Sequence, residues 1–151
     1  MFTDIVAYTE ELGINVVLNE KENRFQLKTN EMMHDVGLSQ GNVLLDIFYE
    51  ETLHVVFLGL LRLPKQIRKQ KHSTNILTII KSHLETHEYT VFVDSCEGCE
   101  NFWRKQAFLK MFQNIYGFDI MGYPYDKEAL FTIWNDFKQT DLFKKEFYYY
   151  I

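Results

Sequence analysis

The chain has 151 residues, of which 46% are hydrophobic and 25% are charged. This composition excludes a disordered chain, and the length suits a single domain over residues 1–151 with a substantial core. The formal net charge of −5 argues against a general nucleic-acid binder, because such proteins carry a basic surface.

The N-terminal segment MFTDIVAYTEEL carries no feature of a secretory signal. It has an acid at position 4 and no basic residue ahead of its apolar positions. The longest apolar run in the chain is far shorter than a membrane span. We therefore expect a cytoplasmic protein without a membrane partner.

The first part of the chain predicts a helix followed by two strands. Apolar residues over 3–12 recur at helical spacing, and Gly13 follows them as a helix stop. Segments 14–18 and 24–29 predict strands, joined by the polar turn 19–23.

A loop or a single helical turn is expected over 32–41. Segments 43–49 and 54–63 then predict an antiparallel hairpin. The second segment is almost continuously apolar, which is typical of a central strand covered on both faces.

The second half of the chain alternates predicted helices with strands. We expect a helix over 73–87, a buried strand over 90–94, and a longer helix from about Glu97 to Tyr116–Gly117. Residues 118–123 predict a further strand. A strand, a crossover helix and a strand imply two parallel neighbours in one sheet.

The C-terminal region predicts one more helix and an aromatic tail. Asp126 is suited to cap a helix that runs to about Phe137, whose apolar stripe should face the core. Segment 145–151 predicts a last strand. Its aromatic tail, Phe147–Ile151, could be buried, or it could form an edge that pairs with a second copy to make a homodimer. The whole order predicts an α/β fold, with a mixed antiparallel and parallel central sheet and helices on both faces.

A basic loop joins the apolar strand at 54–63 to the helix at 73–87. It carries four Lys or Arg residues over 65–71 and no glycine. A helix N-terminus that follows a strand and a short loop can hold an anion, so a polyanion should bind here.

Two segments of the chain resemble the GNAT superfamily of N-acetyltransferases. Arg68-Lys-Gln-Lys71-His-Ser73 fits the frame of the family's Arg/Gln-x-x-Gly-x-Gly/Ala loop, with Ile76-Leu77 as the following apolar pair. Cys96-x-x-Cys99-x-x-Phe102-Trp103-x-Lys105-x-Ala107-Phe108 is similar to the family's Asn-x-x-Ala-x-x-Phe-Tyr-x-Lys-x-Gly-Phe. The resemblance covers roughly residues 43–120.

This resemblance implies a GNAT-like acyl-CoA N-acyltransferase fold, acetyl-CoA as cofactor, and transfer of an acetyl group to a primary amine of a small molecule or peptide. The cofactor would lie between the strands at 54–63 and 90–94. The residues that would bind it are Leu61, Leu63, Arg68, Lys69, Gln70, Lys71, His72, Ser73, Asn101 and Trp103.

The chain departs from the family at positions that matter for chemistry. Lys71 and Ser73 stand in the two glycine-type positions, and Ser73 could also cap the helix. Trp103 stands where many relatives carry a tyrosine that protonates the leaving thiolate, and an indole cannot do so. Tyr116 is the alternative acid, and Asp94 is the candidate base, ahead of Glu50 and Glu51.

A second interpretation stays open beside the enzyme. On the same fold, a catalytically inactive relative could bind a protein partner, and both the glycine-free loop and Trp103 favour it. The spacing of Cys96 and Cys99 suits a redox or metal site, but in the family frame Cys99 is a small residue that packs the helix. His83 and His87 lie one turn apart on a helix, and we interpret them as solvated, without a metal.

Overall fold

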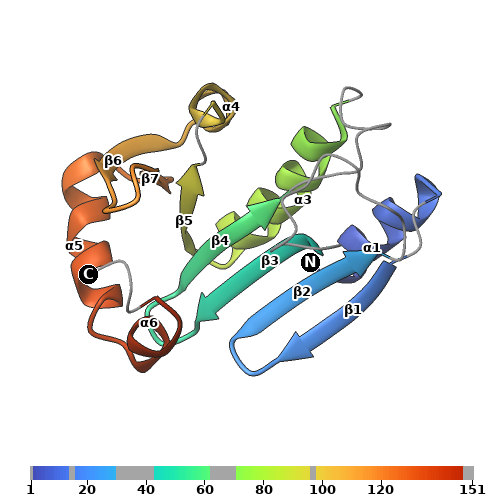
Figure 1. The fold of residues 1–151 in the computed structure, drawn as a ribbon, viewed down its shortest axis with the longest axis horizontal. Coiled ribbons are helices and arrows are strands. Elements are labelled where there is room, and N and C mark those ends of the chain that lie inside the picture. Colours follow the sequence, from blue (N-terminus) through green and yellow to red (C-terminus); the bar gives the residue numbers. More distant parts are fainter. Residues whose placement is uncertain (1, 14–15, 30–42, 62–70, 96–97, 148–151) are drawn as a thin grey trace. The chain divides into compact units, whose positions relative to one another are not determined.

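The computed structural model describes residues 2–13, 16–29, 43–61, 71–95 and 98–147 (Figure 1). Internal contacts divide the chain into two compact units. Unit 1 comprises residues 1–47 and 59–87, and unit 2 comprises residues 48–58 and 88–151. A single domain over the whole chain remains a prediction.

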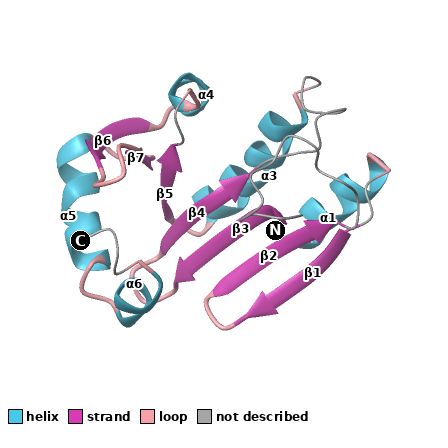
Figure 2. Ribbon diagram, in the orientation of Figure 1, coloured by secondary structure: helices cyan, strands magenta, loops and turns pink. Residues whose placement is uncertain are grey.

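One mixed sheet of seven strands has the order β1-β2-β3-β4-β5-β7-β6, which confirms the predicted fold class (Figure 2). No helix among the described residues is long and apolar enough to cross a membrane.

Unit 1 contains the first strands of the sheet and two helices. α1 packs on α3, and β1 pairs with β2 in antiparallel register from Val16–Thr29 to Lys21–Arg24. The elements that contribute to this unit are α1 (Phe2–Glu11), β1 (Val16–Lys21), β2 (Arg24–Thr29), β3 (Val43–Glu50), β4 (Val55–Leu61) and α3 (His72–Thr86). The predicted first helix, hairpin strands and crossover helix are confirmed with shifts of a few residues at their ends.

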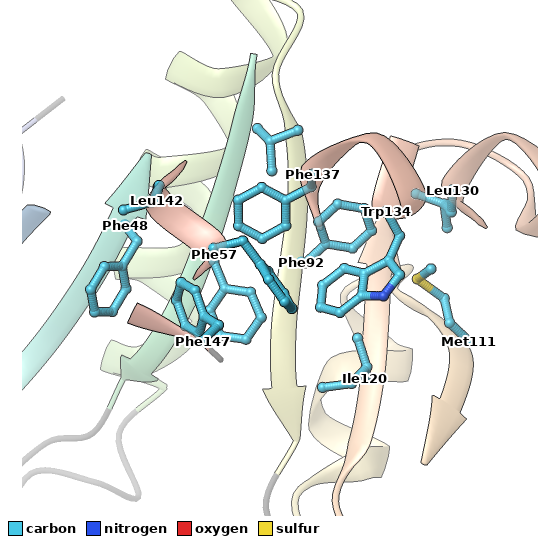
Figure 3. Close-up of a cluster of buried hydrophobic side chains, with 12 residues drawn as sticks. Phe48, Phe57, Phe92, Met111, Ile120, Leu130, Trp134, Phe137, Leu142 and Phe147 are labelled. Carbon is cyan, nitrogen blue, oxygen red and sulfur yellow. The ribbon is translucent and has the colours of Figure 1, made fainter. Parts of the chain in front are cut away.

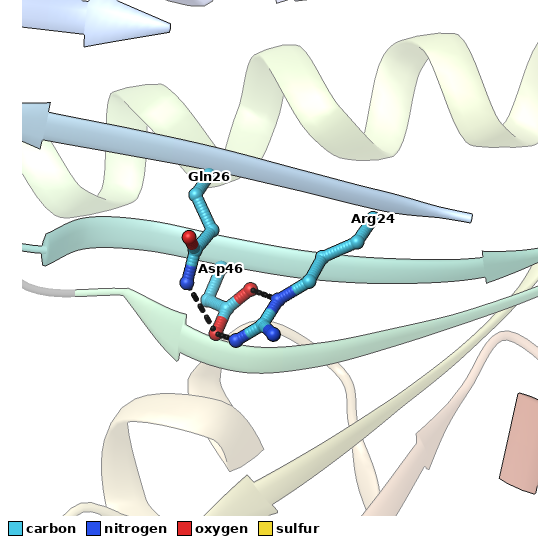
Figure 4. A network of polar contacts seen from close by, with 3 residues as sticks. All are labelled: Arg24, Gln26 and Asp46. Carbon is cyan, nitrogen blue, oxygen red and sulfur yellow. Dashed lines mark hydrogen bonds and ion pairs between the residues drawn. The ribbon is translucent and has the colours of Figure 1, made fainter. Parts of the chain in front are cut away.

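A polar network fixes the pairing of β2 with β3 within unit 1 (Figure 4). Arg24 donates from Nε and Nη2 to the two carboxylate oxygens of Asp46 at 3.0 and 2.8 Å. Gln26 donates from Nε2 to the same carboxylate at 3.3 Å. Such a two-pronged contact is directional, so it favours one register of the strands.

Unit 2 contains the parallel strand pair and the C-terminal half of the chain. β4 and β5 are parallel from Val55–Thr90 to Leu58–Val93, and β5 pairs antiparallel with β7. The elements here are the start of β4 with β5 (Thr90–Ser95), α4 (Glu100–Lys105), β6 (Leu109–Gln113), β7 (Asp119–Tyr123), α5 (Lys127–Phe137) and α6 (Asp141–Glu146). The predicted parallel neighbours are therefore confirmed.

An aromatic cluster covers one face of the sheet in unit 2 (Figure 3). Phe57 and Phe92 are register partners on β4 and β5, and Trp134 and Phe137 of α5 pack over them. The predicted apolar stripe of α5 is thus core. α4 lies on the other face of the sheet. Its Trp103 contacts Phe108, and the Phe108 ring stacks on Tyr123 of β7. Because side chains alternate along a strand, Tyr123 points to the face opposite that of Ile120, which belongs to the cluster.

Both C-terminal helices begin with a side-chain cap. The Asp126 carboxylate accepts from the Ala129 N–H at 2.9 Å, as predicted. The Thr140 hydroxyl accepts from the Phe143 N–H at 3.2 Å and starts α6, a helix that was not predicted from the sequence.

The predicted helix from Glu97 to Tyr116 is wrong after Lys105. Ala107 adopts φ +70°, its N–H bonds the Arg104 carbonyl at 3.0 Å, and the Phe108 N–H bonds the Trp103 carbonyl at 3.1 Å. This pair of bonds is a Schellman ending, which usually has glycine at the left-handed residue. Because alanine stands there, the stop was not visible, and β6 was missed.

The predicted strand over 145–151 is wrong where the structure describes it. Lys145 and Glu146 close α6, and Phe147 follows as a buried member of the aromatic cluster. Residues 148–151 and the predicted loop at 32–41 lie outside the described residues.

Candidate functional site

The start of α3 is the part of the predicted anion-binding loop that the structure describes. Lys71 is the N-cap residue, with φ +62° and ψ +18° and no side-chain cap bond. Ser73 therefore does not cap the helix, which corrects the prediction, and lies within its first turn. The Lys71 carbonyl accepts from the Asn75 N–H at 3.1 Å, which closes that turn.

The left-handed backbone at Lys71 is the conformation that glycine adopts without strain and other residues adopt at a cost. In the GNAT resemblance, Lys71 stands in a position where the family has glycine. Its backbone adopts the left-handed conformation that glycine favours. The remaining difference is the side chain of Lys71, which is exposed.

An anionic group fits this helix start on physical grounds. α3 is 15 residues long and has no acidic residue in its first turn. The first N–H groups of a helix lack intrahelical acceptors, and the helix dipole favours negative charge beside them. The helix start therefore suits an anionic group, such as the diphosphate of a nucleotide cofactor.

The first helix, α1, reaches the start of α3 through Tyr8. Its hydroxyl lies 2.7 Å from Nδ1 of His72 and accepts from Asn75 Nδ2 at 2.8 Å. Farther along α3, His83 Nε2 lies 2.9 Å from an oxygen of Asp4. Sequence reasoning missed Tyr8, because no pattern in the chain links residues 64 positions apart.

The structure describes only some of the other predicted cofactor residues. Leu61 ends β4, and Asn101 is exposed on α4. The remaining predicted positions lie outside the described residues, namely Leu63, Arg68, Lys69 and Gln70.

Trp103 is a core residue of α4. Only 7% of it is exposed, and its ring lies edge-on to Phe102 and Phe108 at centroid distances of 5.0 and 5.2 Å. In the position of the family's tyrosine, this chain therefore has a buried aromatic ring with no acidic hydroxyl.

The two predicted catalytic residues lie on different elements, Asp94 on a strand and Tyr116 in a turn. Asp94 is half-buried on β5, one residue beyond the last position paired with β4, and its register partner on β7 is Ile120. Its side chain leaves the sheet on the face that carries Phe92. Tyr116 is not at a helix end: it lies in the β6–β7 turn and is 57% exposed.

The β6–β7 turn that carries Tyr116 is held by Asn114. The Asn114 Oδ1 accepts from the N–H groups of Tyr116 and Phe118 at 2.9 and 3.0 Å. β7 lies between β6 and β5 in the sheet, so the strand that carries Asp94 is not adjacent to the one that precedes Tyr116.

Two further side chains singled out in the sequence have structural partners. Cys99 is disulfide-bonded, and it stands at the N-cap of α4, whereas Cys96 lies outside the described residues. His83 was predicted to be solvated, but its Nε2 lies 2.9 Å from Oδ2 of Asp4 on α1.

No protein-family profile matches the chain, and no curated protein matches it. Solved structures do match. Tetrahymena Gcn5 has a TM-score of 0.50 and 11% identity, over 71% of this chain and 73% of that chain. A Klebsiella pneumoniae protein named for a proposed acyl-CoA N-acyltransferase activity has a TM-score of 0.50 and 11% identity, over 82% of this chain and 88% of that chain.

A third structure, the PaiA N-acetyltransferase of Thermoplasma acidophilum in complex with coenzyme A, has a TM-score of 0.47 and 10% identity. It matches 82% of this chain and 69% of that chain. The first two likenesses give the chain a GNAT-like acyl-CoA N-acyltransferase fold.

Proposed function

We propose that the protein binds acetyl-CoA and transfers its acetyl group to a primary amine of a small molecule or peptide. The observation that carries the proposal is the left-handed Lys71 at the start of α3, in a GNAT-like fold. The main-chain N–H groups of the first turn of α3 would hold the diphosphate, assisted by His72 and by the basic residues of the preceding loop.

The reaction would need a base and a hydrogen-bond donor at the reacting carbonyl. Asp94 would accept a proton from the amine, because it follows the last β4–β5 pair and is half-buried. A strand N–H near the same position would hold the charge that develops on the carbonyl oxygen. Acetyl-CoA supplies the activated acyl group, and a thiol is released.

A second candidate, favoured by one observation, is a catalytically inactive protein that binds a protein partner on the same fold. Trp103 is buried in the core, so α4 presents no acidic hydroxyl at that position. Tyr116 would have to act instead, and it belongs to an exposed turn. Under this alternative the cofactor could bind without turnover.

Thermal unfolding with and without acetyl-CoA tests the binding step. A ligand that binds only the folded state raises the melting temperature. A free acetyl-CoA concentration of about 100 times its Kd adds about 2.7 kcal/mol to the free energy of unfolding. No rise at about 1 mM acetyl-CoA would contradict the proposal. A thiol-release assay with a panel of primary amines then separates the enzyme from the inactive binder.

A further inference from the structure

β6 is the last strand in the order of the sheet, and it pairs with β7 along Leu109–Gln113. Its outer edge therefore presents main-chain N–H and C=O groups that bind to no other described strand. Leu109 and Lys110 at the beginning of β6 are exposed, as is Gln113 at its end. A sheet edge of this kind can pair with a further strand.

Exposed apolar side chains gather on the hairpin that β6 forms with β7. Six large hydrophobic side chains are exposed among the residues that the structure describes, and four of them lie within residues 109–118. These four are Leu109 (44% exposed), Ile115 (67%), Tyr116 (57%) and Phe118 (36%). Single exposed apolar residues are ordinary on a protein surface, but a group of them on one hairpin indicates an interaction surface.

The β6–β7 hairpin is electrically neutral, although the chain has a net charge of −5. Segment 107–119 contains one basic residue, Lys110, and one acidic residue, Asp119. A lysine on an edge strand usually hinders association, but Lys110 Nζ lies 3.4 Å from Oδ1 of Asp119 and is paired within its own hairpin. A neutral apolar surface does not select a charged partner, and two acidic chains can meet there without repulsion.

We propose that β6 pairs in antiparallel register with β6 of a second copy, and that the β6–β7 hairpin is the contact of a homodimer. A two-fold axis makes the two strands antiparallel, so the beginning of one β6 lies beside the end of the other. The exposed Ile115 and Phe118 of one copy then approach the end of α4 in the other, where Lys105 is exposed. Because a cation beside an aromatic ring is favourable, each copy supplies both halves of this contact.

Sedimentation velocity of the full chain tests the homodimer. The 18.1 kDa chain should reach twice that mass as its concentration rises from about 1 to about 100 µM, as expected of a small interface. Ile115→Glu should weaken dimerisation at least about 30-fold, because the dimer would bury two unpaired carboxylates. The control Leu18→Glu adds the same charge to β1 at the opposite end of the strand order, where Leu18 is 42% exposed, and should leave the dimer intact.

Hydrogen exchange of the wild type at low and high protein concentration locates the contact without any variant. Amide exchange should slow at high concentration over Leu109–Gln113 of β6 and stay unchanged over Val16–Lys21 of β1. A chain that stays monomeric throughout the concentration range would overturn the proposal. So would a dimer that Leu18→Glu dissociates, or one that survives Ile115→Glu, since the contact would then lie away from the β6–β7 hairpin.

Discussion

Leu58 of β4 and Val93 of β5 are partners at the last paired position of a parallel ladder that begins at Val55 and Thr90. β5 continues to Ser95, and its last two residues pair with Ile120 and Asp119 of β7. Asp94, the candidate base, therefore comes directly after the end of the β4–β5 ladder. The proposed acyl transfer depends on this position, because backbone groups beyond a ladder's end can bind a ligand instead of a neighbouring strand.

Two replacements of Lys71 separate the effect of its charge on acetyl-CoA binding from the effect of its Cβ. Lys71→Gly should raise the free energy of unfolding by about 1 kcal/mol, because glycine adopts φ +62° without strain. Lys71→Ala loses the same charge but keeps a Cβ. Acetyl-CoA should therefore bind Lys71→Gly more tightly than Lys71→Ala, which isothermal titration calorimetry can measure.

The matched control for this pair is Glu88→Gly. Glu88 is exposed, has φ +58°, and lies after α3, away from its N-terminus. Its replacement should stabilise the protein by a similar amount and leave acetyl-CoA binding unchanged. Equal affinities of Lys71→Gly and Lys71→Ala would show that the Cβ at this position does not hinder the diphosphate.

Replacement of Asp94 tests the proposed base. Asp94→Asn keeps the shape of the side chain but removes its capacity to accept a proton at neutral pH. We expect the thiol-release rate to fall about 10²-fold to 10⁴-fold, the usual contribution of general base catalysis, while the rise in melting temperature with acetyl-CoA persists. A variant that keeps the wild-type rate would remove Asp94 from the mechanism.

The sequence predicted α3 but not the end of α4. The periodic apolar residues of α3 and the buried strand after it predicted a parallel pair, because burial pattern and length determine such elements locally. The end of α4 could not be predicted, since it depends on Ala107 in a conformation normally reserved for glycine. Tyr8 was missed for a different reason: its contact with His72 forms only when α1 packs on α3.

Tyr89, which precedes β5 in unit 2, gives a test that does not depend on cofactor binding. Its ring stacks on His54 at a centroid distance of 5.0 Å. Burial, with a smaller contribution from the Glu51 carboxylate, raises the pKa of Tyr89 above its ordinary value of 10.0. A raised pKa means that the folded state holds the proton more tightly than the unfolded state. This contribution to stability is complete below pH 10.0 and is lost as the pH rises through the folded-state pKa.

Tyr89→Phe should therefore show a smaller loss of stability above pH 10.0 than the wild type, measured by urea unfolding at a series of pH values. Glu51→Gln should lower the pKa of Tyr89, since it removes the carboxylate. Identical alkaline profiles of wild type and Tyr89→Phe would contradict this assignment.

Gly122 of β7 allows α5 to approach the sheet. A Cβ at this position would lie 2.9 Å from both terminal carbons of Leu130 and 3.1 Å from the Met111 sulfur. Gly122→Ala should thus destabilise the protein by about 1–3 kcal/mol through overpacking. Leu130→Val shortens the opposing side chain, so the double variant should lose less stability than the sum of the single losses. Strict additivity in chemical unfolding would show that the two side chains do not meet.

The central claim is that the start of α3 binds the diphosphate of an acyl-CoA. Calorimetric titration with acetyl-CoA and with acetyl-pantetheine, which has the thioester arm but no diphosphate, tests it most directly. We predict that acetyl-CoA binds and that acetyl-pantetheine binds at least about tenfold more weakly, because charge-assisted bonds to phosphate are lost. Equal affinities for the two compounds, or no heat from either, would contradict the account.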